Sequence, residues 1–166
     1  NIDRLSRIIN NLLDISKIEA GRVELKKEFV DIAELARSVL GAFESRFKAK
    51  GLDISFEADS GGVWIFVDAD KMVQVFTNLL NNALKFTNQG SVSVKIRHAH
   101  DTVECMISDT GIGISEEDIP RVFQKFQQFG RTPGAGDIGT GLGLSIVIGI
   151  VELHKGKVQV VSHVGK

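Results

Sequence analysis

Asn78-Leu79-Leu80-Asn81-Asn82-Ala83-Leu84-Lys85 is the stretch around which the rest of the chain is organised. Asn78 and Asn82 are four residues apart and Lys85 follows three later, so a helix presents all three along one face. The neighbouring apolar positions are Val75, Phe76, Leu79, Leu80, Ala83 and Phe86. We therefore expect a helix that buries most of its circumference and keeps one polar stripe.

The residue types of that stripe suit a metal ion bridged to an anion. Two amide oxygens at this spacing can hold a hard cation, and the Lys85 ammonium can meet the anion. Magnesium with a nucleotide phosphate chain is the natural pair, because magnesium keeps few protein ligands and takes the rest from phosphate and water. Solvated surface amides are the alternative, and the stretch alone does not decide between the two.

Length, charge and cysteine content narrow the class of protein. A chain of 166 residues suits one core domain plus an appendage, and its net charge of -1 provides no basic field for nucleic acid. The single cysteine, Cys105, excludes an internal disulfide, and its apolar alternation predicts a buried strand position. No apolar run approaches the ~20 residues of a membrane span, and no signal-peptide pattern is present. We expect a cytoplasmic fragment of a longer protein, whether or not that parent is membrane-anchored.

Hydrophobic periodicity, capping residues and glycine positions predict the order of elements. The expected elements are a helix over 1–20, a weak strand over 22–30, a helix over 31–50, strands over 52–56 and 63–67 across a turn at 59–62, the central helix over 68–87, strands over 92–96 and 102–108, a short helix over 115–123, a loop over 124–139, a helix ending near 153, and a strand over 157–162. This order predicts an α/β fold, a two-layer α/β sandwich whose mixed, mostly antiparallel sheet carries helices on one face.

Asp109-Thr110-Gly111-Ile112-Gly113 interrupts the pattern directly after a strand. Asp109 therefore stands at a strand end, and Gly111 and Gly113 lack the side chains that would block a flat ligand. A carboxylate accepts a hydrogen bond from an exocyclic amino group, which adenine carries at its six-position and guanine does not. An ordinary turn aspartate is the alternative for this motif taken by itself.

A second glycine motif, Gly139-Thr140-Gly141-Leu142-Gly143-Leu144, opens the last helix. Glycines at this position leave backbone N–H groups uncovered at a positive helix N-terminus, which favours an anion such as phosphate. The motif differs from the P-loop, because no lysine and serine or threonine follow in register. A glycine-rich hinge that binds nothing is the alternative.

These parts together resemble the ATP-binding catalytic domain of sensor histidine kinases. The pattern is an amide helix, the Asp-x-Gly-x-Gly segment, Phe123 and Phe126, a flexible loop and the second glycine motif. The same Bergerat or GHKL fold is shared with gyrase, MutL and the large heat-shock chaperone. The resemblance covers nearly the whole chain from about residue 30, and it implies ATP and Mg2+ as ligands.

Residue roles follow from this resemblance and are expectations here. The resemblance implies that the amides of Asn78 and Asn82 bind magnesium and phosphate and that Lys85 contacts phosphate. It implies that Asp109 recognises adenine in a pocket lined by Gly111 and Gly113. It also implies that Phe123 and Phe126 form the base of a lid over about 127–139, and that the second glycine box consists of Gly139, Thr140, Gly141, Leu142 and Gly143. Arg131 in the lid is a candidate for the terminal phosphate, with a solvated loop charge as the equal alternative.

Asn78 also separates two reactions within the superfamily. Hydrolysing members resemble one another in carrying a glutamate here that activates water, and an amide cannot act as that base. We therefore expect transfer of the γ-phosphoryl group to another group and not rapid hydrolysis.

The first residues resemble the end of the second helix of the dimerisation and phosphoacceptor hairpin. This predicts residues 1–21 as a remnant of that helix and 22–166 as the ATP-binding domain, with its C-terminal strand truncated. None of the four histidines, at 98, 100, 154 and 163, has the context of a phosphoacceptor. The implied partners are the parent's own hairpin and a response regulator, in a parent that is a homodimer.

Two other functions remain open at this point. One is a serine kinase of the anti-sigma type, which shares the domain and lacks the hairpin; the apolar stripe of residues 1–20 disfavours it. The other is a nucleotide-dependent binding switch, which the completeness of the motifs disfavours.

Overall fold

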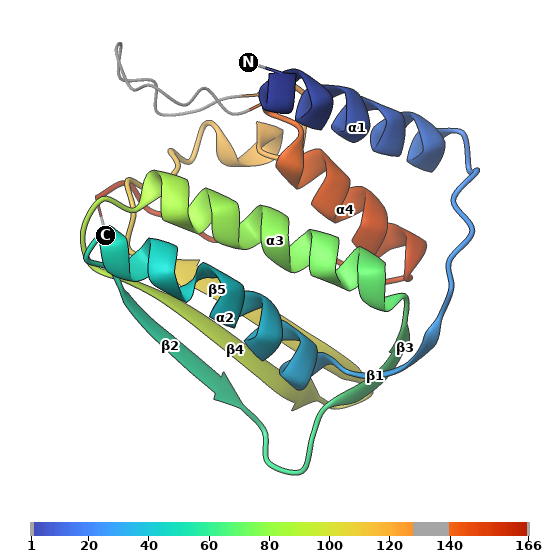
Figure 1. Cartoon of the computed structure of the whole chain (residues 1–166), viewed down its shortest axis with the longest axis horizontal. Helices are drawn as coiled ribbons and strands as arrows, with labels where there is room; N and C mark the ends of the chain where they lie inside the picture. The colour runs from blue at the N-terminus through green and yellow to red at the C-terminus, as the bar shows by residue number, and fades with distance from the viewer. Residues whose placement is uncertain (1, 128–139, 166) are drawn as a thin grey trace. The chain divides into compact units, whose positions relative to one another are not determined.

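The computed structural model describes residues 2–127 and 140–165. They form two compact units (Figure 1). The sheet unit is Leu25–Gly113 with Gly165, and the helical unit is the chain up to Glu24 together with Ile114–Val164.

The sheet unit contains two small sheets. One pairs β1 (Glu28–Asp31) antiparallel with β3 (Trp64–Val67), with Phe29 opposite Phe66. The other has the order β2-β4-β5, with β2 (Asp53–Ala58), β4 (Ser91–Ala99) and β5 (Thr102–Asp109). Here β2 runs parallel to β4 and β5 antiparallel to it. This mixed topology confirms the predicted α/β class.

Helices α2 (Ile32–Ala49) and α3 (Ala69–Phe86) lie side by side over the sheet in Figure 1. Their apolar faces and the sheet's inner face form the core, because each places side chains at the spacing that buries them together. The fully buried members include Ile32, Phe47, Leu80, Val92, Val94 and Ile96. This packing confirms the expected layer of helices on a sheet.

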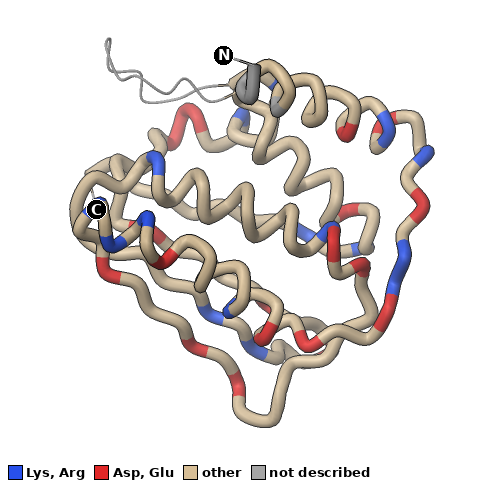
Figure 2. The backbone as a smooth tube through the Cα atoms, viewed as in Figure 1, with Lys and Arg blue, Asp and Glu red and all other residues tan. Residues whose placement is uncertain are grey.

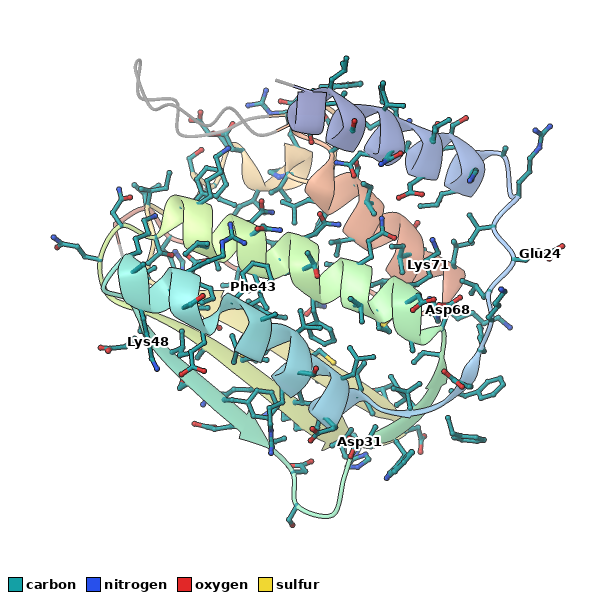
Figure 3. All side chains as sticks on the ribbon, in the orientation of Figure 1. Glu24, Asp31, Phe43, Lys48, Asp68 and Lys71 are labelled. Carbon is teal, nitrogen blue, oxygen red and sulfur yellow. The ribbon has the colours of Figure 1, made fainter. Side chains whose placement is uncertain are left out.

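Asp68 fixes the N-terminus of α3, close to Lys71 in Figure 3. One carboxylate oxygen, Oδ1, accepts from the Lys71 N–H at 3.1 Å, and Oδ2 accepts from the Lys26 N–H at 2.9 Å. The side chain is only 6% exposed. The cap therefore joins the start of α3 to the segment before β1, in addition to satisfying a free N–H of the helix.

The helical unit consists of α1 (Ile2–Glu19), the short 3-10 turn η1 (Ile119–Arg121) and α4 (Gly143–Leu153). Helix α1 packs against α4, and a Cβ atom at Gly149 would lie 3.0 Å from Cγ2 of Ile18. Helix α4 of the same chain thus covers part of the apolar stripe of α1. The rest of its apolar stripe is exposed at Leu5, Ile9, Leu12 and Leu13.

Several expected elements differ from the structure. The strand over 22–30 shortens to β1, the helix over 115–123 is only η1, and no strand forms over 157–162 within the described residues. Cys105 lies in β5 as expected, but its side chain is exposed, because β5 is the outer strand of its described sheet. Strands β2 and β3 follow one another without pairing.

Hydrogen bonds between two segments distant in the sequence keep β3 away from β2. The Ile32 N–H donates to Val63 O at 2.9 Å, and the Val63 N–H donates to the Asp31 carboxylate at 3.1 Å. Residues directly before β3 are therefore held by the junction between β1 and α2. A turn of glycines with positive φ, Gly61 and Gly62, leads into this arrangement.

Charged residues of both signs are interspersed along the described chain in Figure 2. This distribution agrees with the net charge of -1. No helix in the described part of the chain is long and apolar enough to cross a membrane.

We predict that Asp31 makes the stability of the chain depend on pH in the acid range. Its carboxylate accepts N–H bonds from Val63, Ala33 and Glu34, and above all the Val63 N–H holds the pKa of Asp31 below its ordinary value of 3.8. The stabilisation is therefore complete above the unfolded-state pKa and is lost as the pH falls through the lower folded-state pKa.

The variant Asp31→Asn keeps a capping oxygen and removes the titrating charge. Urea unfolding followed by circular dichroism between pH 2 and 7 should show a flatter acid limb for it than for the unsubstituted chain. Asp53→Asn, at an exposed position in β2, is the matched control. Equal acid limbs for Asp31→Asn and the unsubstituted chain would contradict the assignment.

Candidate functional site

The polar face of α3 carries two amides that are available to a ligand. Asn78 and Asn82 are half-buried, and no hydrogen bond joins either amide to another residue in the described part of the chain. Asn81, between them, instead accepts from Arg46 Nη1 at 3.2 Å. The structure therefore distinguishes one amide held by the protein from two that keep their oxygens free.

The C-terminal end of α3 meets the end of β5. The Ile112 N–H donates to Phe86 O at 3.2 Å, and the Thr87 N–H donates to Ala83 O at 3.0 Å. Thr87 is fully buried, and its Oγ1 donates to Asp109 Oδ1 at 3.4 Å. The amide helix and the Asp-x-Gly-x-Gly segment are thus parts of one junction within the sheet unit.

Asp109 is held through one carboxylate oxygen only. Oδ1 accepts from the Gly111 N–H at 2.9 Å as well as from Thr87, whereas no described residue donates to Oδ2. A carboxylate accepts several hydrogen bonds, so an oriented oxygen remains for a donor from outside the protein. This geometry fits the predicted role of Asp109.

Gly111 has no room for a side chain at this junction. A Cβ atom there would lie 2.5 Å from Phe86 O and 2.6 Å from Asp109 Oδ1. Gly113 has a φ of 72°, a conformation that glycine adopts without strain. The two predicted glycines therefore serve the backbone geometry beside Asp109.

Lys85 and Lys50 provide the positive charge at the same end of α3. The exposed Lys85 ammonium lies 4.9 Å from the centroid of the Phe86 ring. Lys50 Nζ donates to Leu84 O at 2.6 Å and so neutralises a free carbonyl of the last helical turn. Sequence reasoning found Lys85 but missed Thr87 and Lys50, whose roles depend on contacts between distant segments.

The helical unit holds the other predicted residues. Gly141, with a φ of 70°, accepts from the Phe126 N–H at 2.9 Å, and a Cβ atom there would lie 2.8 Å from Phe126 Cα. Phe126 itself has a φ of 63° and is 62% exposed, while Phe123 is half-buried. The phenylalanine segment and the second glycine box are therefore in direct contact, as the motif order alone did not show.

The start of α4 leaves its N-terminal N–H groups without a side-chain cap. Leu142 occupies the N-cap position with its side chain fully buried, and Gly143 begins the helix. Thr140 Oγ1 accepts from the Leu142 N–H at 3.3 Å. Such a helix start favours an anion. Gly139 and Arg131 of the predicted site lie outside the described residues.

The donor set on α3 also fits magnesium. Its half-buried amide oxygens are hard ligands, and an ion that completes its shell with phosphate and water needs few of them. Among the residues described, no group of three or more His, Cys, Asp or Glu side chains is placed to hold a metal ion. Asn78 and Asn82 are consequently the candidates.

These features define an ATPase-type nucleotide domain, and comparison with known proteins identifies its family. The family described as "Histidine kinase-, DNA gyrase B-, and HSP90-like ATPase" matches residues 67–166. The chain belongs to this family. The predicted resemblance is confirmed by this match and by the histidine kinases among the similar proteins.

Three similar proteins illustrate the relationship. Hybrid signal transduction histidine kinase D of Dictyostelium discoideum is 37% identical over 96% of this chain and 11% of its own length. The structure of full-length ShkA in complex with AMPPNP has a TM-score of 0.88 at 30% identity, covering 99% of this chain and 34% of ShkA. Histidine kinase ThkA, in complex with the response regulator protein TrrA, has a TM-score of 0.71 at 25% identity over 93% and 42% of the two chains.

The chain spans only a small part of the curated relatives that it matches. The spanned share is 11% for the Dictyostelium discoideum protein and 34% for BaeS of Escherichia coli. Similarity therefore identifies this domain and leaves the activity of the whole parent to be proposed.

We predict opposite effects of alanine at two glycines of the sheet unit. Gly111→Ala should destabilise the chain by about 1–3 kcal/mol, because its Cβ atom meets the backbone of Phe86. Gly41→Ala in α2, where nothing lies within 4 Å of the added Cβ, should stabilise the chain by up to about 1 kcal/mol.

Urea unfolding of both variants measures these free energies. A Gly111→Ala variant as stable as the unsubstituted chain would show that the junction of α3 and β5 adapts to a side chain.

Proposed function

We propose that the chain is the ATP-binding catalytic domain of a sensor histidine kinase, a protein-histidine kinase fragment. In the parent it transfers the ATP γ-phosphoryl group to a histidine on the phosphoacceptor helix, from which a response regulator takes it. The free Oδ2 of Asp109, oriented by Gly111 beside the amide helix, is the observation that carries this proposal.

Adenine recognition is assigned to Asp109. Its Oδ2 accepts a hydrogen bond from the six-amino group of adenine, while Oδ1 stays on the Gly111 N–H. Guanine carries a carbonyl at that position, and two acceptors facing one another bind poorly. Gly111 and Gly113 let the ring approach the backbone, so the site selects ATP over GTP.

Phosphate binding is assigned to the polar face of α3 and to the second glycine box. Asn82 and Asn78 supply the amide oxygens, and Lys85 supplies a mobile positive charge. Bound magnesium would neutralise charge on the phosphates and fix their orientation. The N–H groups at Gly141 and Gly143 favour phosphate oxygens, and Gly139, Thr140, Leu142 and Arg131 complete the proposed set.

Asn78 makes phosphoryl transfer to a protein the favoured reaction. An amide does not remove a proton from water, so the domain lacks a base at the position where hydrolysing relatives carry one. Catalysis then rests on positioning the γ-phosphoryl group and neutralising its charge, with Lys85 as the protein's own cation. The nucleophile is a histidine of the hairpin.

The proposed domain organisation keeps residues 1–21 as the end of the hairpin helix and 22–166 as the ATP-binding domain. The exposed apolar residues Leu5, Ile9, Leu12 and Leu13 of α1 support a helical partner and a homodimeric parent. Similarity to ThkA, solved with a response regulator, supports a response regulator as the second partner. We place the domain in the cytoplasm, with a parent that is soluble or membrane-anchored.

Incubation with γ-labelled ATP and Mg2+ tests the transfer. A separately made phosphoacceptor hairpin of the parent serves as substrate, and the label is then treated with acid and with base. Acid-labile, base-stable label on the hairpin alone is expected, because phosphohistidine has that stability. Stable label on serine, or release of phosphate without labelled protein, would contradict the proposal.

We predict that Asp109→Ala weakens ATP binding by about 10- to 150-fold, the equivalent of about 1.5–3 kcal/mol for a charge-assisted hydrogen bond. Isothermal titration calorimetry measures the affinity, and circular dichroism checks the fold. Asp101→Ala, at an exposed turn residue, is the control. Unchanged ATP affinity in Asp109→Ala would remove the adenine assignment.

We predict that Asn82→Ala lowers affinity more with Mg2+ than with EDTA present, because the lost oxygen is a metal ligand. Asn81→Ala is the matched control, since its amide is held by Arg46. Calorimetry in both buffers gives the two ratios. Equal losses with and without the metal would show that Asn82 acts by some other contact.

A further inference from the structure

A groove outside the residues assigned to ATP runs between α2 and β2 in the sheet unit. It has a volume of about 320 Å³ and is lined by Arg37, Leu40, Gly41, Glu44, Ile54, Ser55 and Phe56. In Figure 1, β2 forms the edge of its sheet with α2 beside it. The groove therefore lies beside residues 54–56 of an edge strand.

The outer edge of β2 offers free backbone groups. The Asp53 N–H donates to Gly90 O at 3.0 Å, and the Asp59 N–H donates to Ile96 O at 3.2 Å. In a parallel pair, residues that bond the neighbouring strand alternate with residues that face away. Ile54 and Phe56 thus direct their N–H and C=O groups outward, where no strand pairs with them in the described part of the chain.

Gly41 keeps the helix side of the groove open. Glycine in the middle of a helix costs roughly 1 kcal/mol relative to alanine. Nothing within 4 Å would oppose a Cβ atom at this position, and the backbone is helical. Since neither packing nor backbone conformation requires glycine here, its effect is to leave space above Leu40 and Ile54.

Two charged side chains, Glu44 and Arg37, line the groove, and their surroundings differ. Glu44 forms an ion pair with Lys48, with 2.6 Å between Glu44 Oε1 and Lys48 Nζ. Arg37 stacks on Phe56, with Cζ 4.7 Å from the ring centroid, and no carboxylate of a described residue lies within ion-pair distance. The stacked guanidinium is therefore the charge available to a carboxylate from outside.

The spacing of these features matches an extended chain. Arg37 and Gly41 are four residues apart on α2, which is about 6 Å at ~1.5 Å per residue. Side chains on one face of a strand repeat every second residue, which is about 6.6 Å at ~3.3 Å per residue. An extended segment that lies along β2 can therefore place one side chain in the open space over Gly41. The next side chain on the same face then lies beside the Arg37 guanidinium.

We propose that this groove binds an extended segment of a partner protein, which adds to β2 as a further strand. Backbone bonds to Ile54 and Phe56 hold the segment, an apolar side chain fills the space over Gly41, and an acidic side chain two residues away pairs with Arg37. This is recognition by strand addition, in which backbone bonds give affinity and the groove gives specificity.

Selection of a phage-displayed library of random dodecapeptides on the 166-residue chain tests the proposal. Three variants are compared: Gly41→Leu fills the groove, Arg37→Glu reverses its charge, and Ser38→Leu is an exposed control on the same helix that does not line the groove. Enriched peptides are then titrated into 15N-labelled chain, and amide hydrogen exchange is measured at Ile54 and Phe56.

Enriched peptides should carry an apolar and an acidic residue two positions apart. Gly41→Leu and Arg37→Glu should weaken binding at least tenfold, Ser38→Leu less than twofold, and bound peptide should slow exchange at the Ile54 and Phe56 amides at least tenfold. Circular dichroism and urea unfolding confirm that the variants fold. Failure to enrich any peptide, equal binding to Gly41→Leu, or unprotected β2 amides would each overturn the proposal.

Discussion

The hydrogen bond from the Gly111 N–H to Asp109 Oδ1, at 2.9 Å, orients the carboxylate on which the proposed nucleotide site depends. The next residue, Ile112, donates to Phe86 O at 3.2 Å, so the same short segment also closes the last turn of α3. The absence of a side chain at Gly111 permits both contacts. The end of β5, which carries the hydrogen-bond acceptor Asp109, is thereby joined to α3, which carries the two amides and the Lys85 ammonium.

Hydrogen bonds of charged side chains hold both ends of helix α3. At its N-terminus the buried N-cap residue Asp68 accepts from the Lys71 N–H of the first turn and from the backbone N–H of Lys26. At its C-terminus Lys50 donates to Leu84 O, and along its length Arg46 holds Asn81. These contacts leave Asn78 and Asn82 on the face that has no hydrogen-bond partner among the described residues. Helix α3 thus presents amides whose oxygens are free for a ligand, while Asp68, Lys50 and Arg46 fix the orientation of the helix.

Sequence reasoning was strongest where the information is local. The spacing of Asn78, Asn82 and Lys85, the capping aspartates and the glycine motifs predicted α2, α3 and α4, and the α/β class is confirmed. It failed where contacts join distant segments: the separation of β2 from β3 depends on Asp31 and Val63, and the packing of α1 on α4 depends on Gly149. The expected strand over 157–162 did not form, because alternation alone does not supply a neighbouring strand. Thr87 was missed because its role follows only from its position beside Asp109.

A crystal structure of this chain with AMPPNP and Mg2+ would test the nucleotide site directly. We expect Asp109 Oδ2 about 2.7–3.2 Å from the six-amino nitrogen of adenine, with Oδ1 still on the Gly111 N–H. We also expect the Asn82 amide oxygen about 2.0–2.1 Å from magnesium. A nucleotide whose base lies away from Asp109, or a metal held without either α3 amide, would contradict the assignment of this site.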